Sequence, residues 1–184
     1  DQRLLLAFQN PTPGIWMIRV YAEGNLENTF HMWLPVTGFI SDETYFLRPD
    51  PDTTVTEPGN AEGVLTFSGY DARNGSIWYD SGRGYTRNGR IKPDLAAPAV
   101  EVAAVNLWGR VTTLTGSSAA AALGAGACAL LLEWGIVRGN VPAMDSITIQ
   151  RYLIRGANRL NIFDYPNKTW GYGSLDLYDA FRTI

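Results

Sequence analysis

Residues 112–134 read TTLTGSSAAAALGAGACALLLEW, and this stretch decides the fold of the chain. β-Branched residues open it, a glycine and two serines form a turn, and Ala, Gly and Leu follow with no charge before Glu133. Ala and Leu favour helix, and the run is too long for an ordinary buried strand. A helix that is apolar on every side belongs in a domain core. The stretch therefore predicts a strand, a tight turn and a buried central helix.

Two glycines inside the predicted helix indicate close packing. Gly124 and Gly126 are expected to let neighbouring backbone approach the helix, since neither carries a Cβ atom. A leucine at position 126 is then expected to overpack the core, at a cost of roughly 1–3 kcal/mol or more. The helix is also too short and too rich in Ala and Gly to predict a membrane span.

The serines at the start of this helix allow two interpretations. The first turn of a helix has backbone N–H groups without partners and the positive end of the dipole. A serine nucleophile whose substrate develops an oxyanion fits there, and so does a serine that merely caps the helix. On these residues alone the cap is the simpler interpretation.

The composition of the 184 residues excludes several classes of function. Hydrophobic residues make up 46%, which is enough for one medium domain or two small ones. A net charge of −3 predicts no binding to nucleic acid or to an anionic membrane. No cofactor or metal site is predicted, because carboxylates such as Asp50, Asp52 and Asp71 lie in loops where solvation is the commoner state. Cys128 is the only cysteine, so it forms no internal disulfide and is expected to pack in the core.

The first part of the chain predicts a β-rich module. Aromatic and β-branched residues between turn signals predict three strands, at residues 4–8, 15–22 and 29–34. Such strands are typical of a β-sandwich or jelly roll. Prolines and glycines from residue 35 to 60 resist regular structure. Residues 1–52 are therefore expected to form a partial β-module with a linker, which begins inside a strand as a fragment of a longer protein would.

Residues 53–184 predict a different layer. Strands are expected at residues 63–70, 100–105 and 111–114. Ser146 is expected to cap a helix that ends near Gly156, and a short helix is expected at residues 177–182. Strands followed by helices predict an α/β fold.

One motif in this second part resembles a known family. Residues 116–120, GSSAA, resemble the Gly-Thr-Ser-x-Ala motif around the nucleophile of the subtilisin-like serine proteases, the subtilases. Residues 90–98, RIKPDLAAP, resemble the family segment Arg-x-Lys-Pro-Asp-x-x-Ala-Pro. Further segments match in the same order, at residues 63–67, 79–84 and 170–173. The resemblance covers residues 53–184 and implies the C-terminal half of a subtilisin-like three-layer α/β domain with parallel strands and a buried central helix.

The departures from the family pattern point to a subgroup. Ala99 stands where the family usually has glycine, and Ala122-Leu123 replace a Pro-His pair that takes no part in catalysis. With the β-module, these features look like the germination-type subtilases of spore-forming bacteria, in which a jelly roll interrupts the catalytic domain. That resemblance implies a bacterial protein that is extracellular or associated with the spore.

The resemblance implies a serine endopeptidase that acts on protein or peptide substrates. Ser118 is the expected nucleophile, and the Ser117 hydroxyl is expected to support the oxyanion hole. The catalytic Asp, the catalytic His and the oxyanion Asn are expected before Asp1, in the upstream half of the same protease domain, so this chain alone is expected to be inactive. His31 could serve as the base, but a strand of the β-module with no nearby aspartate is an unsuitable place for one. A non-catalytic pseudoprotease or regulatory protein with the same fold is the alternative.

Overall fold

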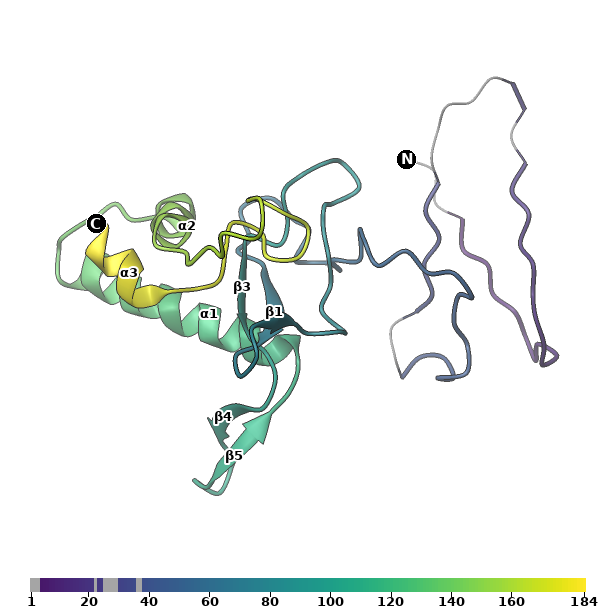
Figure 1. The fold of residues 1–184 in the computed structure, drawn as a ribbon, viewed down its shortest axis with the longest axis horizontal. Helices are drawn as coiled ribbons and strands as arrows, with labels where there is room; N and C mark the ends of the chain where they lie inside the picture. Colours follow the sequence, from purple (N-terminus) through teal and green to yellow (C-terminus); the bar gives the residue numbers. More distant parts are fainter. Residues whose placement is uncertain (1–3, 22, 25–29, 36–37) are drawn as a thin grey trace. The chain divides into compact units, whose positions relative to one another are not determined.

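The structure is a computed structural model that describes residues 4–21, 23–24, 30–35 and 38–184 of the chain. Its contacts divide the chain into two units, residues 1–47 and 48–184, which are considered separately below (Figure 1). The predicted boundary at residue 52 lies slightly further along the chain.

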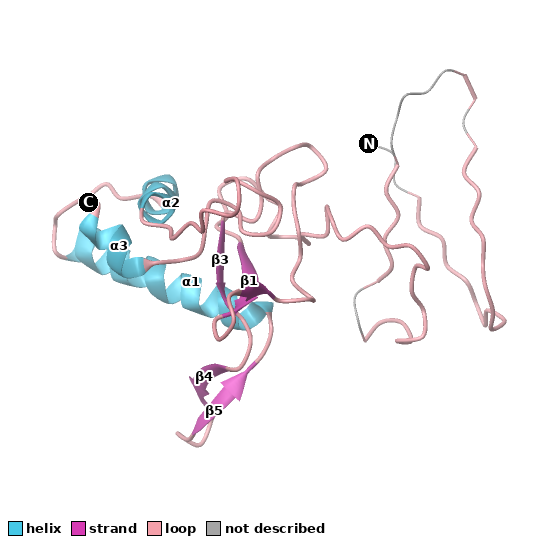
Figure 2. Cartoon of the chain, in the orientation of Figure 1, coloured by secondary structure: helices cyan, strands magenta, loops and turns pink. Residues whose placement is uncertain are grey.

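The first unit does not show the predicted strands. The described residues of 4–8, 15–22 and 29–34 form no strand, and residues 22 and 29 lie outside the described residues (Figure 2). Strands need hydrogen-bonded neighbours and a covered apolar face. Here Trp16 and Trp33 are 54% and 52% exposed, and Trp16 makes an edge contact with the nearby Phe8. A jelly-roll identity for this unit stays a prediction.

The second unit has a small mixed sheet, a separate hairpin and three α-helices (Figure 2). In chain order the elements are β1 (Phe67–Asp71), β2 (Ser76–Ile77), β3 (Leu95–Pro98), β4 (Val102–Val105), β5 (Val111–Leu114), α1 (Ser117–Leu132), the π-helix η1 (Glu133–Val137), α2 (Ser146–Arg155) and α3 (Leu177–Arg182). The three-stranded sheet has the order β2-β1-β3. In this sheet β2 is antiparallel and β3 parallel to β1, and β4 pairs with β5 in an antiparallel hairpin. The predicted α/β layer with parallel strands is confirmed.

Strand β3 was not predicted, because its sequence Leu-Ala-Ala-Pro has little strand propensity. Backbone pairing on both sides makes it a strand. Phe67 to Tyr70 of β1 pair with Leu95 to Pro98 along one edge. Along the other edge, Ala96 donates to the carbonyl of Gly173 at 2.9 Å and accepts from Leu175 at 2.7 Å.

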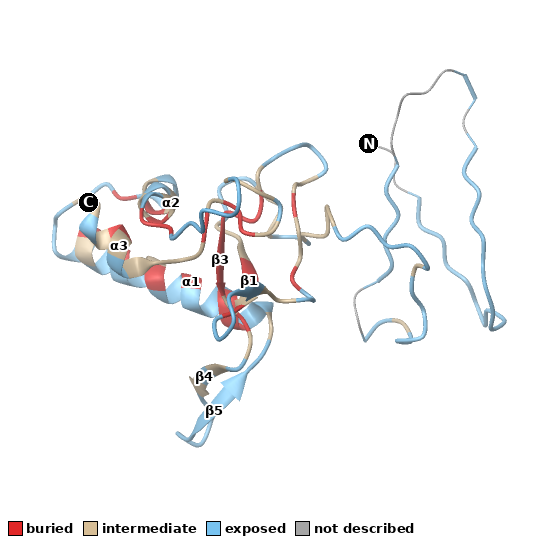
Figure 3. Ribbon diagram, in the orientation of Figure 1, coloured by how far each residue is buried: buried red, intermediate tan, exposed pale blue. Residues whose placement is uncertain are grey.

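Helix α1 packs one face against β1 and β3 (Figure 3). The buried residues on that face are Ala119, Ala120, Gly124, Ala127 and Leu131. The opposite face, with Ala122, Ala125 and Ala129, is exposed, and beside the buried face Leu123 and Leu130 are 39% and 49% exposed. The prediction of a helix buried on all sides is therefore wrong for the described chain, because the described residues supply a sheet on one side only. By length and composition Ser117–Val137 could cross a membrane, a test that core helices also pass.

The two glycines of α1 differ. A Cβ atom at Gly124 would lie 2.2 Å from Cε2 of Phe67, so this glycine allows a close approach, although by an aromatic side chain and not by the neighbouring backbone that was predicted. A Cβ atom at Gly126 would meet no atom within 4 Å. The overpacking predicted for Gly126 is therefore wrong, since two residues along a helix turn the side chain by about 200°, onto the open face.

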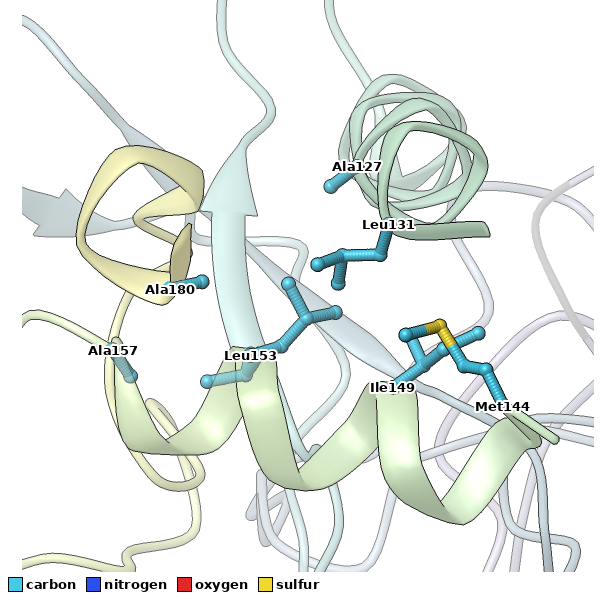
Figure 4. Packing of buried hydrophobic residues seen from close by; sticks show 8 residues of the cluster. Ala127, Leu131, Met144, Ile149, Leu153, Ala157 and Ala180 are labelled. Atoms are coloured by element: carbon cyan, nitrogen blue, oxygen red, sulfur yellow. The ribbon is translucent and has the colours of Figure 1, made fainter. Parts of the chain in front are cut away.

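Helix α2 packs against α1 and β3 and completes the main buried cluster. Its Leu153 and Ile149 meet Leu131 of α1, Leu95 of β3 and Met144 in one buried cluster (Figure 4). The cluster also contains the small residues Ala127, Ala157 and Ala180.

The cap of α2 is Asp145, one residue before the predicted Ser146. Its Oδ1 accepts hydrogen bonds from the backbone N–H and the hydroxyl of Thr148, at 2.8 and 2.7 Å. These bonds, the hydroxyl's first, lower the pKa of Asp145 from its ordinary value. Helix α3 has the predicted bounds.

Candidate active site

A turn at Gly116 connects β5 to α1. Gly116 has φ +153°, a conformation that favours glycine. Its N–H donates to the carbonyl of Ala99 at 2.8 Å, and its carbonyl accepts from Ala119 at 3.0 Å. The residue before the turn is also fixed, because Oγ1 of Thr115 accepts from the N–H of Glu101 at 2.9 Å. The backbone on both sides of the turn is therefore held.

Ser117 and Ser118 are the first two residues of α1, and both are exposed. The cap position belongs to Gly116, and no side chain caps the helix. The interpretation of these serines as an N-cap is therefore wrong. The hydroxyls are free to act at a helix end where backbone N–H groups lack intrahelical partners. A nucleophile and an oxyanion donor can share this place.

Small buried residues fix the start of α1 against the sheet. Ala120 forms a cluster with Ala97 and Ala99, all of them fully buried. Ala99 is the residue that replaces the usual glycine, and its methyl group faces Gly69 of β1. A Cβ atom built at Gly69 would lie 2.5 Å from Cβ of Ala99. The departure from the family pattern at position 99 is accommodated by the absence of a side chain at position 69.

The Arg-x-Lys-Pro-Asp segment is a buried anchor. The carboxylate of Asp94 accepts at Oδ2 from Nζ of Lys92 and from the N–H of Thr66, both at 2.7 Å, and at Oδ1 from Nε2 of Gln150 at 2.6 Å. Nζ of Lys92 also donates to the carbonyl of Val64. Lys92 and Asp94 are 5% and 2% exposed. The segment thus ties β3 to the approach of β1 and to α2, which is a structural role.

A second set of ion pairs, which sequence reasoning missed, links the end of β1 to the residue before β4. Arg73 donates to Asp71 at 2.8 Å and also pairs with Glu101. Hydrogen bonds from the Arg73 side chain lower the pKa of Asp71. Arg73 and Glu101 are far apart in sequence, so no local pattern predicts the pair. It steadies the base of the hairpin that leads to Ser118.

The other sequence candidates belong to the first unit or lie further along α1. His31 is exposed in the first unit, where its ring stacks on Trp33 with centroids 5.3 Å apart. It is the only histidine of the chain, so the unit with Ser118 contains none. Cys128 is half buried on α1, and burial raises the pKa of its thiol.

The three loop carboxylates considered for a cation are not gathered. Asp52 pairs with Lys168, Asp71 pairs with Arg73, and Asp50 accepts from the N–H of Asp52 at 2.9 Å. Within the part of the chain that the structure describes, no group of three or more His, Cys, Asp or Glu side chains could hold a metal ion.

Comparison with known proteins decides the family. The family model described as peptidase S8, subtilase family, matches residues 9–173 of the chain. The chain is a subtilase. The match confirms the resemblance and begins well before residue 53, where the sequence motifs placed its start.

Solved subtilase-like structures agree with this assignment. The chain is 38% identical to the CspB protease of Clostridium perfringens, with a TM-score of 0.72 over 76% of this chain and 30% of that one. It is 25% identical to the prenylagaramide maturation protease PagA, with a TM-score of 0.58 over 72% of this chain and 46% of that one. An uncharacterized protein of Aquifex aeolicus (strain VF5) is 33% identical over 96 residues, 45% of this chain and 42% of that protein. The subtilase chain thus spans less than half the length of each of these relatives.

Proposed function

We propose that this subtilase chain is part of a serine endopeptidase in which Ser118 is the nucleophile. The observation that carries the proposal is the start of α1, where two exposed serines follow a glycine cap and neither hydroxyl is used to cap the helix. A hydroxyl that the fold does not use, at a helix end with free N–H groups, is suited to attack a carbonyl and to stabilise the oxyanion that forms.

In the proposed reaction, Oγ of Ser118 forms a bond to the scissile carbonyl carbon and its proton passes to a histidine. The backbone N–H of Ser118 donates to the oxyanion, and the Ser117 hydroxyl supports that site. The C–N bond then breaks, and the departing amine takes the proton from the histidine. Water hydrolyses the acyl-enzyme in the reverse sense and frees the serine.

The base, its orienting aspartate and the oxyanion asparagine are proposed to come from protease-domain sequence outside these 184 residues. The unit that holds Ser118 has no histidine, since His31 belongs to the other unit. The exposed face of α1 offers an apolar surface for the rest of such a domain. The isolated chain is therefore expected to be inactive.

The subgroup is also a proposal. The identity of 38% to the Clostridium perfringens CspB protease supports a germination-type subtilase of a spore-forming bacterium. Residues 13–16 and 30–35 resemble the last strands of the jelly-roll insertion in that subgroup. An extracellular or spore-associated location follows from the same resemblance.

The test uses a fluorophosphonate probe on the full-length protein and on the isolated chain. We expect the probe to label Ser118 in the full-length protein and to leave the isolated chain unlabelled. Ser118→Ala should abolish both labelling and peptide cleavage.

Ser117→Ala is the matched control, because it removes a neighbouring hydroxyl that contributes at most one hydrogen bond, and it should weaken cleavage far less. A full-length protein that takes no probe, or that still cleaves as Ser118→Ala, would refute the protease proposal and leave the non-catalytic alternative. Labelling of the isolated chain would show that it contains a base, and His31 would be the residue to examine.

A further inference from the structure

The turn between β4 and β5 is rigid. Oδ1 of Asn106 accepts from the N–H groups of Trp108 and Arg110, both at 3.0 Å. The backbone N–H of Asn106 donates to the carbonyl of Arg110 at 2.9 Å, and that of Gly109 donates to the carbonyl of Asn106 at 3.0 Å. Gly109 has φ +72°, as such a turn requires. The residues at this turn are therefore held in one arrangement before anything binds.

This rigid turn presents apolar side chains to solvent. The hairpin tip, defined here as Val105, Leu107, Trp108 and Val111, has exposed fractions of 70%, 97%, 80% and 81%. Hairpin turns are normally made of polar residues and glycine. A preorganised cluster that contains Trp and Leu is typical of a contact surface, because little conformational entropy is lost on binding.

One edge of the hairpin is also open. Residues of an antiparallel pair alternate between hydrogen-bonded and non-hydrogen-bonded positions. Because Asn106 and Arg110 are hydrogen-bonded, Val105 and Val111, and Ala103 and Thr113, occupy non-hydrogen-bonded positions. The backbone groups of Val111 and Thr113 therefore point away from β4, and the described residues give them no hydrogen-bond partner. An extended polypeptide can satisfy such groups by adding as a strand.

The open edge leads directly to the candidate nucleophile. β5 ends at Leu114, and Ser118 follows after the fixed turn at Gly116. At about 3.3 Å per residue, Val111 lies roughly 13 Å from Thr115 along the strand, and the tip lies beyond it. An extended peptide that runs from Ser118 along β5 therefore reaches the tip about four to six residues from the scissile bond.

We propose that the β4–β5 hairpin is an extended substrate-binding site, and this rests on the proposed role of Ser118. One flank of an unfolded polypeptide substrate adds as a strand to the open edge of β5. An apolar side chain of that flank, several residues from the scissile bond, packs on Leu107 and Trp108. The preferred substrates are extended segments with a large apolar residue at that distance, rather than short peptides.

The test compares short and long quenched-fluorescent peptides with the full-length protein. The long peptides extend six residues on one or the other side of the scissile bond, with leucine or serine placed along the extension. Leucine on one flank should raise kcat/KM about tenfold over serine. The double variant Leu107→Ala/Trp108→Ala should reduce this gain to less than about twofold and leave kcat/KM for short peptides unchanged.

Three further variants distinguish binding from folding. Trp108→Phe should restore most of the gain. Val111→Pro removes an N–H group that faces the open edge and should lower the gain without opening the hairpin. Tyr178→Ala, which removes an aromatic side chain that is 73% exposed on α3, is the matched control and should change nothing.

The outcomes separate this inference from the function on which it rests. If the probe labels Ser118 but leucine gives the same gain in the parent and the double variant, the hairpin site is refuted and Ser118 keeps its role. An equal fall in kcat/KM for short and long peptides would mean that the rest of the domain covers the tip, which also refutes the site. Absence of labelling would refute the proposed function itself.

Discussion

The contact between Gly69 and Ala99 allows a compensating pair of substitutions. Gly69→Ala places a methyl group 2.5 Å from Cβ of Ala99 and 3.2 Å from Cε3 of Trp78. Carbon atoms prefer a separation of about 3.5–4.0 Å. Overpacking of this kind costs about 1–3 kcal/mol, and the lost backbone freedom of glycine returns about 0.4–1 kcal/mol. A net loss of about 1–2 kcal/mol in the free energy of unfolding is expected.

The reverse change, Ala99→Gly, should also destabilise the protein. It removes one buried methyl group, which lowers the free energy of unfolding by about 0.8 kcal/mol. The greater backbone freedom of glycine in the unfolded chain lowers it by about 0.5–1 kcal/mol more. If the two sites were independent, the double variant would lose about 3 kcal/mol. Because the double variant removes the clash between the two methyl groups and keeps only the 3.2 Å contact with Trp78, we expect a loss of less than about 1 kcal/mol and a coupling of about 2 kcal/mol.

Urea unfolding followed by tryptophan fluorescence measures these values, with the m-value as a check that the unfolded state is unchanged. Gly69→Ala combined with Gly126→Ala is the control. A Cβ atom at Gly126 contacts none of the atoms around position 69, so the effects of the two substitutions on the free energy of unfolding should add. A coupling between positions 69 and 99 below about 0.5 kcal/mol would show that the strands move apart without strain, and the explanation of Ala99 given above would be wrong.

Two glycines, a buried ion pair and a helix cap give three further predictions. In thermal unfolding, Gly124→Ala should lower the midpoint temperature. Gly126→Ala should raise it, because alanine in a helix is up to about 1 kcal/mol more favourable than glycine. A lower midpoint for both variants would mean that the exposed face of α1 is covered. Asp94→Ala should cost about 3–5 kcal/mol, because it leaves Lys92 buried without its carboxylate, and an Asp94→Ala protein as stable as the parent would contradict the anchor role. The lowered pKa of Asp145 implies stability that is present above the unfolded value of about 3.9 and lost as pH falls through the folded value; Asp145→Asn should flatten this part of the pH profile of unfolding, and an unchanged profile would refute it.

The sequence predicted the elements whose signals are local. The run of Ala and Leu predicted α1, the cap signal at Ser146 and the glycine at position 156 predicted α2, and β-branched residues predicted β5. Strand β3 was missed because its pairing with β1 and with residues 173–175 is non-local, and alanine and proline give no hint of it. The three strands expected in the first unit were not found, because propensity alone does not make a strand without a hydrogen-bonded neighbour.

In the candidate site, too, local sequence signals were predictive and contacts between distant segments were not. A family motif identified Ser118, yet propensity alone favoured a capping serine. The structure removed that interpretation by placing Gly116 at the cap position. Sequence could not reveal the tie between Arg73 and Glu101 or the open edge of β5, because both depend on how distant segments meet.

If the proposed function holds, the exposed face of α1 and the lack of a histidine in the unit that holds Ser118 would have one cause. The same helix that holds Ser118 leaves Leu123 and Leu130 partly exposed, and they border a face that the described residues do not cover. Burial of such side chains contributes about 25 cal/mol for each Å² of apolar surface removed from water. If the remaining part of the domain covers this face, the packing that stabilises α1 is also what delivers the histidine to Ser118. Ser118 would then become reactive only in the assembled fold, because neither half has both the nucleophile and its base.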